Sequence, residues 1–168
     1  MARGCGSPRR LGLSLALLAL LATWPAGGQT ISLTGSWTLS VSAADLIAGA
    51  GSDFSTPLIS ADNQVLITIS GTAGNSPWDV TVYKIDSPGW PAGLTLRVIR
   101  TGDGTGTGSI NGGTDPGVVV PDGAAGAAAF FDGRRARSNV PVRLRLEGLS
   151  VDLGPPAIYT TTVYYTVN

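Results

Sequence analysis

The stretch Thr-Ile-Ser-Leu-Thr-Gly-Ser-Trp-Thr-Leu-Ser-Val, residues 30–41, alternates between apolar and polar side chains with Gly35 as the only gap. Its apolar row comprises Ile31, Leu33, Trp37, Leu39 and Val41. Successive side chains of a β-strand point to opposite faces, so a period of two predicts one half-buried strand rather than a helix. The Ser-Ala-Ala-Asp sequence at 42–45 then predicts a single capped helical turn.

The same alternation recurs down the chain. Seven further apolar runs lie near residues 65–69, 78–82, 94–98, 118–120, 128–131, 140–146 and 158–167. Segments rich in Gly, Pro, Asn and Asp separate these runs, as is typical of turns. The pattern predicts an all-β domain over residues 29–168, an antiparallel immunoglobulin-like β-sandwich of seven to nine strands. In the last run, Tyr159, Val163, Tyr165 and Val167 are predicted to face the core.

Residues 1–28 are typical of a secretory signal peptide. Arg3, Arg9 and Arg10 form a basic front, an apolar run follows at 11–22, and small residues occupy 26–28. The run is shorter than the roughly 20 residues that a membrane-spanning helix needs. We therefore expect the mature chain to begin at Gln29 without a membrane span. It should be secreted or held at the cell surface, by way of the periplasm if the cell has an outer membrane.

The composition of residues 29–168 disfavours several classes of function. The chain has no His, and its single Cys, Cys5, lies in the predicted signal peptide. A thiol nucleophile, a Ser-His-Asp triad and the usual zinc ligands all require these residues, so we expect neither an enzyme nor a cofactor. Three of the eleven basic residues and none of the eleven acidic ones precede residue 29, which leaves a net charge of −3. Nucleic-acid binding requires a clustered basic surface and is not expected.

Two loops carry patterns that allow more than one interpretation. Residues 101–117 (TGDGTGTGSINGGTDPG) favour a long mobile hairpin, with a calcium site at Asp103, Asn111 and Asp115 as the alternative. Residues 132–137 (DGRRAR) favour a solvated turn balanced by Asp132 and Glu147. An anionic partner or a protease-sensitive site is the alternative there. Glu147 lies among arginines on a predicted strand, which indicates an ion pair rather than a glycosidase acid.

Trp90 is the candidate ligand-binding residue, because it lies in a turn, Ser-Pro-Gly-Trp-Pro at 87–91. An exposed loop aromatic can stack on a sugar ring, whereas a buried one would close one end of the sandwich. The residues that would extend a sugar-binding platform are Trp37, Trp78, Tyr83 and Tyr164.

Both ends of residues 29–168 resemble a known family. Residues 30–41 are similar to the N-terminal segment of secreted pilin-like subunits. Ala-Ile-Tyr-Thr-Thr-Thr-Val-Tyr-Tyr-Thr-Val at 157–167 resembles the Gly-x-Tyr-x-x-x-Val-x-Val-x-Val closing strand of the spore coat protein U family, which belongs with the archaic chaperone–usher pilins. The resemblance implies an incomplete immunoglobulin-like sandwich, completed by an N-terminal strand donated from the next subunit. The family's cysteine pair is absent here, and Ala157 takes the place of its glycine.

The sequence thus predicts a secreted structural subunit of a surface appendage or coat that assembles by β-strand exchange through residues 30–41. Its expected partners are other copies of itself or related subunits, and a periplasmic chaperone. The alternative is a secreted glycan-binding or adhesion module that uses its loops. Alternation is identical whether residues 30–41 pair within their own sandwich or with a neighbour, so both pairings stay open.

Overall fold

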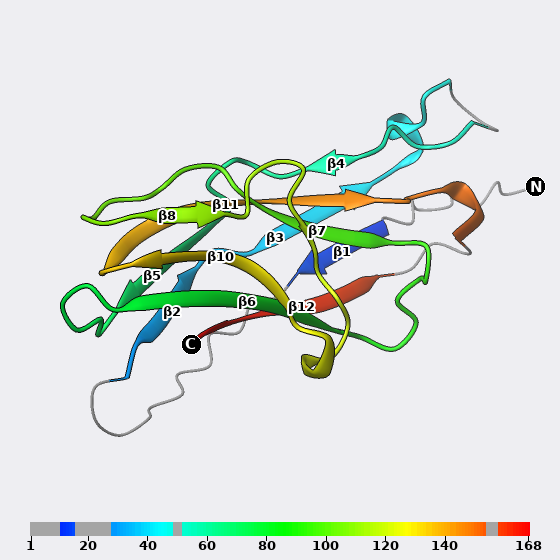
Figure 1. The fold of residues 1–168 in the computed structure, drawn as a ribbon. Coiled ribbons are helices and arrows are strands. Elements are labelled where there is room, and N and C mark those ends of the chain that lie inside the picture. The colour runs from blue at the N-terminus through cyan, green and yellow to red at the C-terminus, as the bar shows by residue number, and fades with distance from the viewer. Residues whose placement is uncertain (1–10, 16–27, 49–51, 154–157) are drawn as a thin grey trace, which may run out of the picture.

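Two β-sheets packed face to face form the molecule in the computed structural model, which describes residues 11–15, 28–48, 52–153 and 158–168 (Figure 1). The first sheet runs in the order β3 (Trp37–Val41), β1 (Leu11–Leu15), β12 (Tyr159–Val167), β6 (Pro77–Asp86), β10 (Ala128–Arg134) and β8 (Ile110–Gly112). The second runs β2 (Thr30–Thr34), β5 (Val65–Ser70), β11 (Arg137–Glu147), β7 (Thr95–Arg100) and β9 (Val118–Val119), and β4 (Leu58–Ile59) also pairs with β11. The predicted all-β antiparallel sandwich is confirmed.

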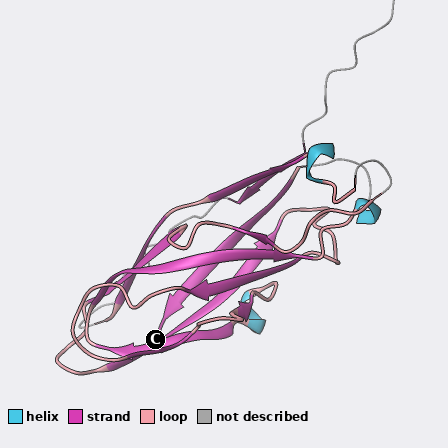
Figure 2. Ribbon diagram, turned by 90° about the horizontal axis from the view of Figure 1, so that it is seen from above, coloured by secondary structure: helices cyan, strands magenta, loops and turns pink. Residues whose placement is uncertain are grey.

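One continuous core lies between the sheets, and the alternation of the sequence builds it. Every second residue of β11, from Val140 to Leu146, is at most 1% exposed. Strands β5, β6 and β7 bury their alternate residues in the same way. The strands of both sheets run along the long axis of the sandwich, and loops gather at its two ends (Figure 2). Period-two patterning therefore sets which face of each strand is buried.

The expectation of one strand over residues 30–41 is wrong, because this stretch divides between the two sheets. Thr30–Thr34 forms β2 beside β5, and Trp37–Val41 forms β3 at the edge of the other sheet. Gly35 makes the crossing with a φ of +124°, and a Cβ there would collide with the carbonyl of Gln64. The inward row is nevertheless kept on both sides of the break: Trp37 and Val41 are buried, and Ile31, Leu33 and Leu39 are half-buried.

The described residues form twelve strands, where the sequence predicts seven to nine. All eight predicted runs are strands, and the division at Gly35 turns the first of them into two. The three additional strands are β1, β4 and β8. Strands β4 and β8 are only two and three residues long, too short for periodicity to reveal them.

The predicted helical turn after residue 41 is confirmed. Ala43–Asp45 is a 3-10 helix capped by Ser42, whose side-chain oxygen accepts a hydrogen bond from the Ala44 N–H at 3.2 Å. The Asp45 carboxylate accepts a reciprocal bond from the Ser42 N–H at 2.7 Å. Within the described part of the chain, no helix is long and apolar enough to cross a membrane.

Strand β1 comes from the predicted signal peptide, yet it lies inside the first sheet. It runs antiparallel to β3, with Leu11 opposite Val41 and Leu15 opposite Trp37. On its other side it runs parallel to β12, with Leu13 opposite Tyr159 (Figure 1). The rest of the predicted signal peptide up to residue 27, including Cys5 and the basic front, lies outside the described residues.

The closing strand faces the core as predicted, and it offers a matched test. Val163 is fully buried, whereas its neighbour Thr162 lies on the opposite face of β12 and is half-buried. We expect Val163→Asp to abolish soluble, folded protein, because it places an unpaired charge in an apolar interior. Thr162→Asp should keep the fold. Soluble yield and thermal melting of the two variants measure the difference, and equal behaviour would contradict the assigned register.

Tyr165 supports a second prediction, because its buried hydroxyl has no hydrogen-bond partner among the described residues. Burial raises the pKa of Tyr165 above its ordinary value of 10.0. The free energy of unfolding should therefore fall as pH rises above 10, since the unfolded chain ionises this group first. Tyr165→Phe should not show this fall above pH 10, and its free energy of unfolding at neutral pH should be higher by about 1–3 kcal/mol. Chemical denaturation across pH measures both, with Tyr83→Phe on the outer face of the same sheet as control. A lower stability of Tyr165→Phe would show that the Tyr165 hydroxyl does have a hydrogen-bond partner.

Candidate functional site

Four polar side chains form a row across the outer face of the first sheet. Asp79 of β6 lies directly opposite Asp132 of β10, and Asp132 lies opposite Asn111 of β8. Asn168, which follows β12, continues the row because its backbone exchanges hydrogen bonds of 3.0 and 3.1 Å with Asp79. The sheet register therefore aligns an Asn-Asp-Asp-Asn row over four neighbouring strands.

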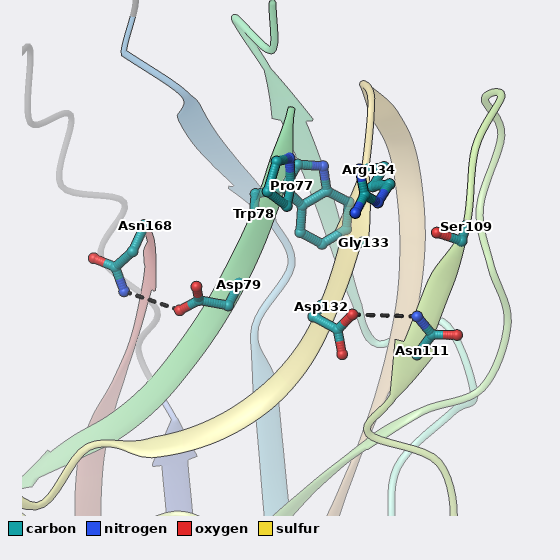
Figure 3. A pocket seen from close by; sticks show the side chains of 9 residues that line it. All are labelled: Pro77, Trp78, Asp79, Ser109, Asn111, Asp132, Gly133, Arg134 and Asn168. Carbon is teal, nitrogen blue, oxygen red and sulfur yellow. Dashed lines mark hydrogen bonds between the residues drawn. The ribbon is translucent and has the colours of Figure 1, made fainter. Parts of the chain in front are cut away.

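An amide holds each carboxylate of this row from its outer side. Asn168 Nδ2 donates to Asp79 Oδ2 at 3.3 Å, and Asn111 Nδ2 donates to Asp132 Oδ2 at 3.2 Å (Figure 3). All four residues are exposed. Like charges directly opposite each other in a sheet are unfavourable, so the amides offset part of a repulsion that the register imposes.

The row forms one side of a pocket of about 570 Å³. Trp78 and Gly133 also line it, together with Ser109 and Arg134 (Figure 3). Trp78 is 2% exposed, and its indole N–H donates to the Arg135 carbonyl at 2.7 Å. A Cβ at Gly133 would lie 2.5 Å from the Trp78 ring, so glycine is needed for the ring to pack there.

The chemistry of the pocket suits a ligand that donates hydrogen bonds. Its two carboxylates accept only, and its amides and the Arg134 guanidinium add donors around them. A sugar carries several hydroxyls that can bond such groups. The described residues contain no group of three or more His, Cys, Asp or Glu side chains placed to hold a metal ion.

Sequence reasoning did not single out Asp79 or Asp132 as a pair. They are 53 positions apart, and each is one polar residue in an ordinary strand. Only the pairing of β6 with β10 brings them together. No local motif could have revealed it, because the neighbours depend on the register of strands distant in the sequence.

The predicted aromatic platform is not assembled. Trp37 and Trp78 are 8% and 2% exposed, so neither offers a ring face to a ligand. Trp90 is half-buried against the core, and its ring centroid lies 5.0 Å from the Lys84 Nζ. Its indole N–H also reaches the Leu94 carbonyl at 3.4 Å. Trp90 thus packs at an end of the sandwich, which is the alternative to sugar binding that the sequence left open for this residue.

The other two platform residues form a separate pair on the outer face of the first sheet. Tyr83 and Tyr164 stack with ring centroids 4.9 Å apart and planes 7° apart. Both are half-buried. Because the rings cover each other, the pair stabilises β6 against β12.

Two buried arginines hold the loop at 101–117 by hydrogen bonds. Arg100 Nε donates to the Gly112 carbonyl at 2.7 Å, and the Arg100 guanidinium pairs with Asp103. Arg137 donates to the carbonyls of Gly106 and Gly108. Part of the loop is strand β8, so the expectation of a simple long hairpin is wrong. Two of the three possible calcium ligands have other partners: Asp103 pairs with Arg100, and Asn111 with Asp132.

The arginines of residues 132–137 do not form one solvated cluster. Arg137 is 7% exposed, whereas Arg134 and Arg135 extend to Asn75 on the neighbouring turn, each with a hydrogen bond of 3.3 Å. Glu147 does not balance them, which corrects that expectation. It pairs instead with Arg97 at 3.1 Å and Arg145 at 2.9 Å, which confirms the ion pair predicted on β11.

The strand-exchange candidates fall into two groups. Ile31 and Leu33 lie on β2, the edge strand of the second sheet. Trp37, Leu39 and Val41 lie on β3, where the first and last are buried in the core. Removing β3 would therefore open the core, whereas β2 has one strand partner in the described part of the chain, β5.

Comparison with protein-family models, with curated proteins and with solved structures finds no match to this chain.

The opposed carboxylates give a testable electrostatic prediction. Asp79→Asn keeps an oxygen that can accept from Asn168 and removes one of two facing charges. We expect the free energy of unfolding to rise by about 0.2–1 kcal/mol at low salt, with a smaller gain at high salt. Urea denaturation at two ionic strengths measures it. The control is Asp152→Asn, an exposed carboxylate on the 3-10 helix Val151–Leu153, which should change little. A loss of stability in Asp79→Asn would show that the pair is not repulsive.

Proposed function

We propose that this protein is a secreted, non-enzymatic structural subunit of a surface appendage or coat, and that copies of it assemble by β-strand exchange. The observation that carries the proposal is the position of β1. Among the described strands, β3 is hydrogen-bonded to its sheet only through Leu11–Leu15, which belongs to the predicted signal peptide. Cleavage near residue 28 would leave a position one strand wide between β3 and β12, here named the strand slot.

The edge of β12 supports the same proposal. Strand β1 covers only Tyr159–Thr161 on that side, and no described strand covers the rest of that edge, up to Val167. Unpaired backbone N–H and C=O groups along an edge are a template for a strand from another chain. The buried side chains of β12, including Val163 and Tyr165, would lie beside the incoming strand.

The donor that suits the strand slot is β2 of a second copy. Its sequence, Thr-Ile-Ser-Leu-Thr, places apolar residues at every second position, as Leu-Gly-Leu-Ser-Leu does in β1. Both segments are five residues long. Leaving its own sheet would break one strand pairing, with β5, because β2 is an edge strand, and would uncover the half-buried Ile31 and Leu33. The part of residues 30–41 that we propose to exchange is therefore Thr30–Thr34 alone, and Trp37–Val41 stays in its own domain.

We also propose where the protein is located and which partners it has. The chain would be exported and its leader removed, through the periplasm where the cell has an outer membrane, with a periplasmic chaperone holding the strand slot until assembly. The incomplete sandwich would then be immunoglobulin-like, as the resemblance to the spore coat protein U family implies.

Exported material provides the test. The full chain, expressed in a host that secretes it, should be recovered starting at Gln29 and should elute as a ladder of oligomers. Leu33→Asp in β2 should reduce the oligomers at least tenfold while the monomer stays folded, because a charge enters the apolar row of the donor. Ser32→Asp, on the exposed face of the same strand, should assemble normally. Intact mass and light scattering measure these outcomes, and a purely monomeric wild type contradicts the proposal.

The second candidate function is that of a secreted glycan-binding or adhesion module, which the pocket at Asp79 and Asp132 favours over the predicted Trp90 loop. The same exported protein would then be a monomer that binds soluble polysaccharide. Asp132→Ala should abolish that binding, and Asp152→Ala should not.

A further inference from the structure

We infer that Leu11–Leu15 is an internal occupant of the strand slot, so the uncut chain is a closed monomer and removal of the leader opens it to a second copy. This inference rests on the proposed function and adds the regulation of the same site. It assigns the leader a role in the folded chain besides export.

Strand β1 pairs with β3 along its whole length. All five residues of β1 are in register with all five residues of β3, from Leu11 opposite Val41 to Leu15 opposite Trp37. Leu15 also lies opposite Thr161 of β12, which is 1% exposed. The β1 backbone is thus placed between core residues of both neighbours, and a second strand cannot enter the strand slot while it is there.

The covalent connection gives the internal strand its advantage over a second copy. Fourteen residues, 16–29, separate the end of β1 from the start of β2. A short covalent connection between two segments sets their effective concentration on the order of millimolar. Against a free subunit at about 1 μM, and with equal intrinsic affinity, the internal strand is favoured about a thousandfold. Strand exchange between uncut chains should be suppressed by a similar factor.

The test uses the full chain, produced without export so that the leader stays attached. Leu13→Pro removes the N–H at the centre of β1, and proline is not tolerated within a central strand. Leu20→Pro makes the same exchange beyond the end of β1 and is the matched control. At micromolar concentration, wild type and Leu20→Pro should be monomers with slow amide exchange in β3, whereas Leu13→Pro should form oligomers.

A synthetic peptide of residues 9–17 separates strand exchange from misfolding of the variant. It should return Leu13→Pro to the monomer by filling the open strand slot, whereas a misfolded aggregate would not respond. Oligomers of the uncut wild type, a monomeric Leu13→Pro, or oligomers that ignore the peptide would each overturn the inference. Because exported protein is measured separately, its assembly decides the proposed function whatever the uncut chain does.

Discussion

The pairing of β12 with the strand beside it is the constraint on which the first sheet depends. β12 lies between β6 and β1, and β1 is the one described strand through which β3 reaches the sheet. Backbone groups at a sheet edge must be paired or left to water, and apolar side chains beside an open edge lose their cover. A five-residue strand therefore determines whether this sandwich is closed or open, and our proposals for assembly and its control both follow from that.

Two arginines hold the loop at 101–117 in place. Arg100 and Arg137 are both buried, and their guanidinium groups donate hydrogen bonds to the carbonyls of Gly112 and Gly106. Such charge-assisted hydrogen bonds fix the loop at 101–117 against β7 and β11. Strand β8 can then pair with β10, which brings Asn111 beside Asp132. The polar pocket is thus a consequence of how the loop is attached, and it lies on the outer face, away from the strand slot.

Much of the fold was predictable from local pattern. Alternation located eight runs, which form nine of the strands, and the buried face of β12, and the Ser-Ala-Ala-Asp sequence located the capped turn at Ala43–Asp45. These features depend on residues within a few positions of each other, which is why one sequence suffices. The candidate site was not predictable in the same way: Trp90 and the aromatic platform were chosen by residue type, and the structure buries Trp37 and Trp78.

The sequence by itself determined the strands, their inward rows and the absence of His, together with a leader-like N-terminus. Only the tertiary structure decided which strands are neighbours. That decision divided residues 30–41 at Gly35, placed Asp79 opposite Asp132, and put Leu11–Leu15 between β3 and β12. The physical reason is that periodicity is a local property of a chain. Register is a property of two segments brought together, and it depends on which apolar faces and backbone edges can be satisfied at once.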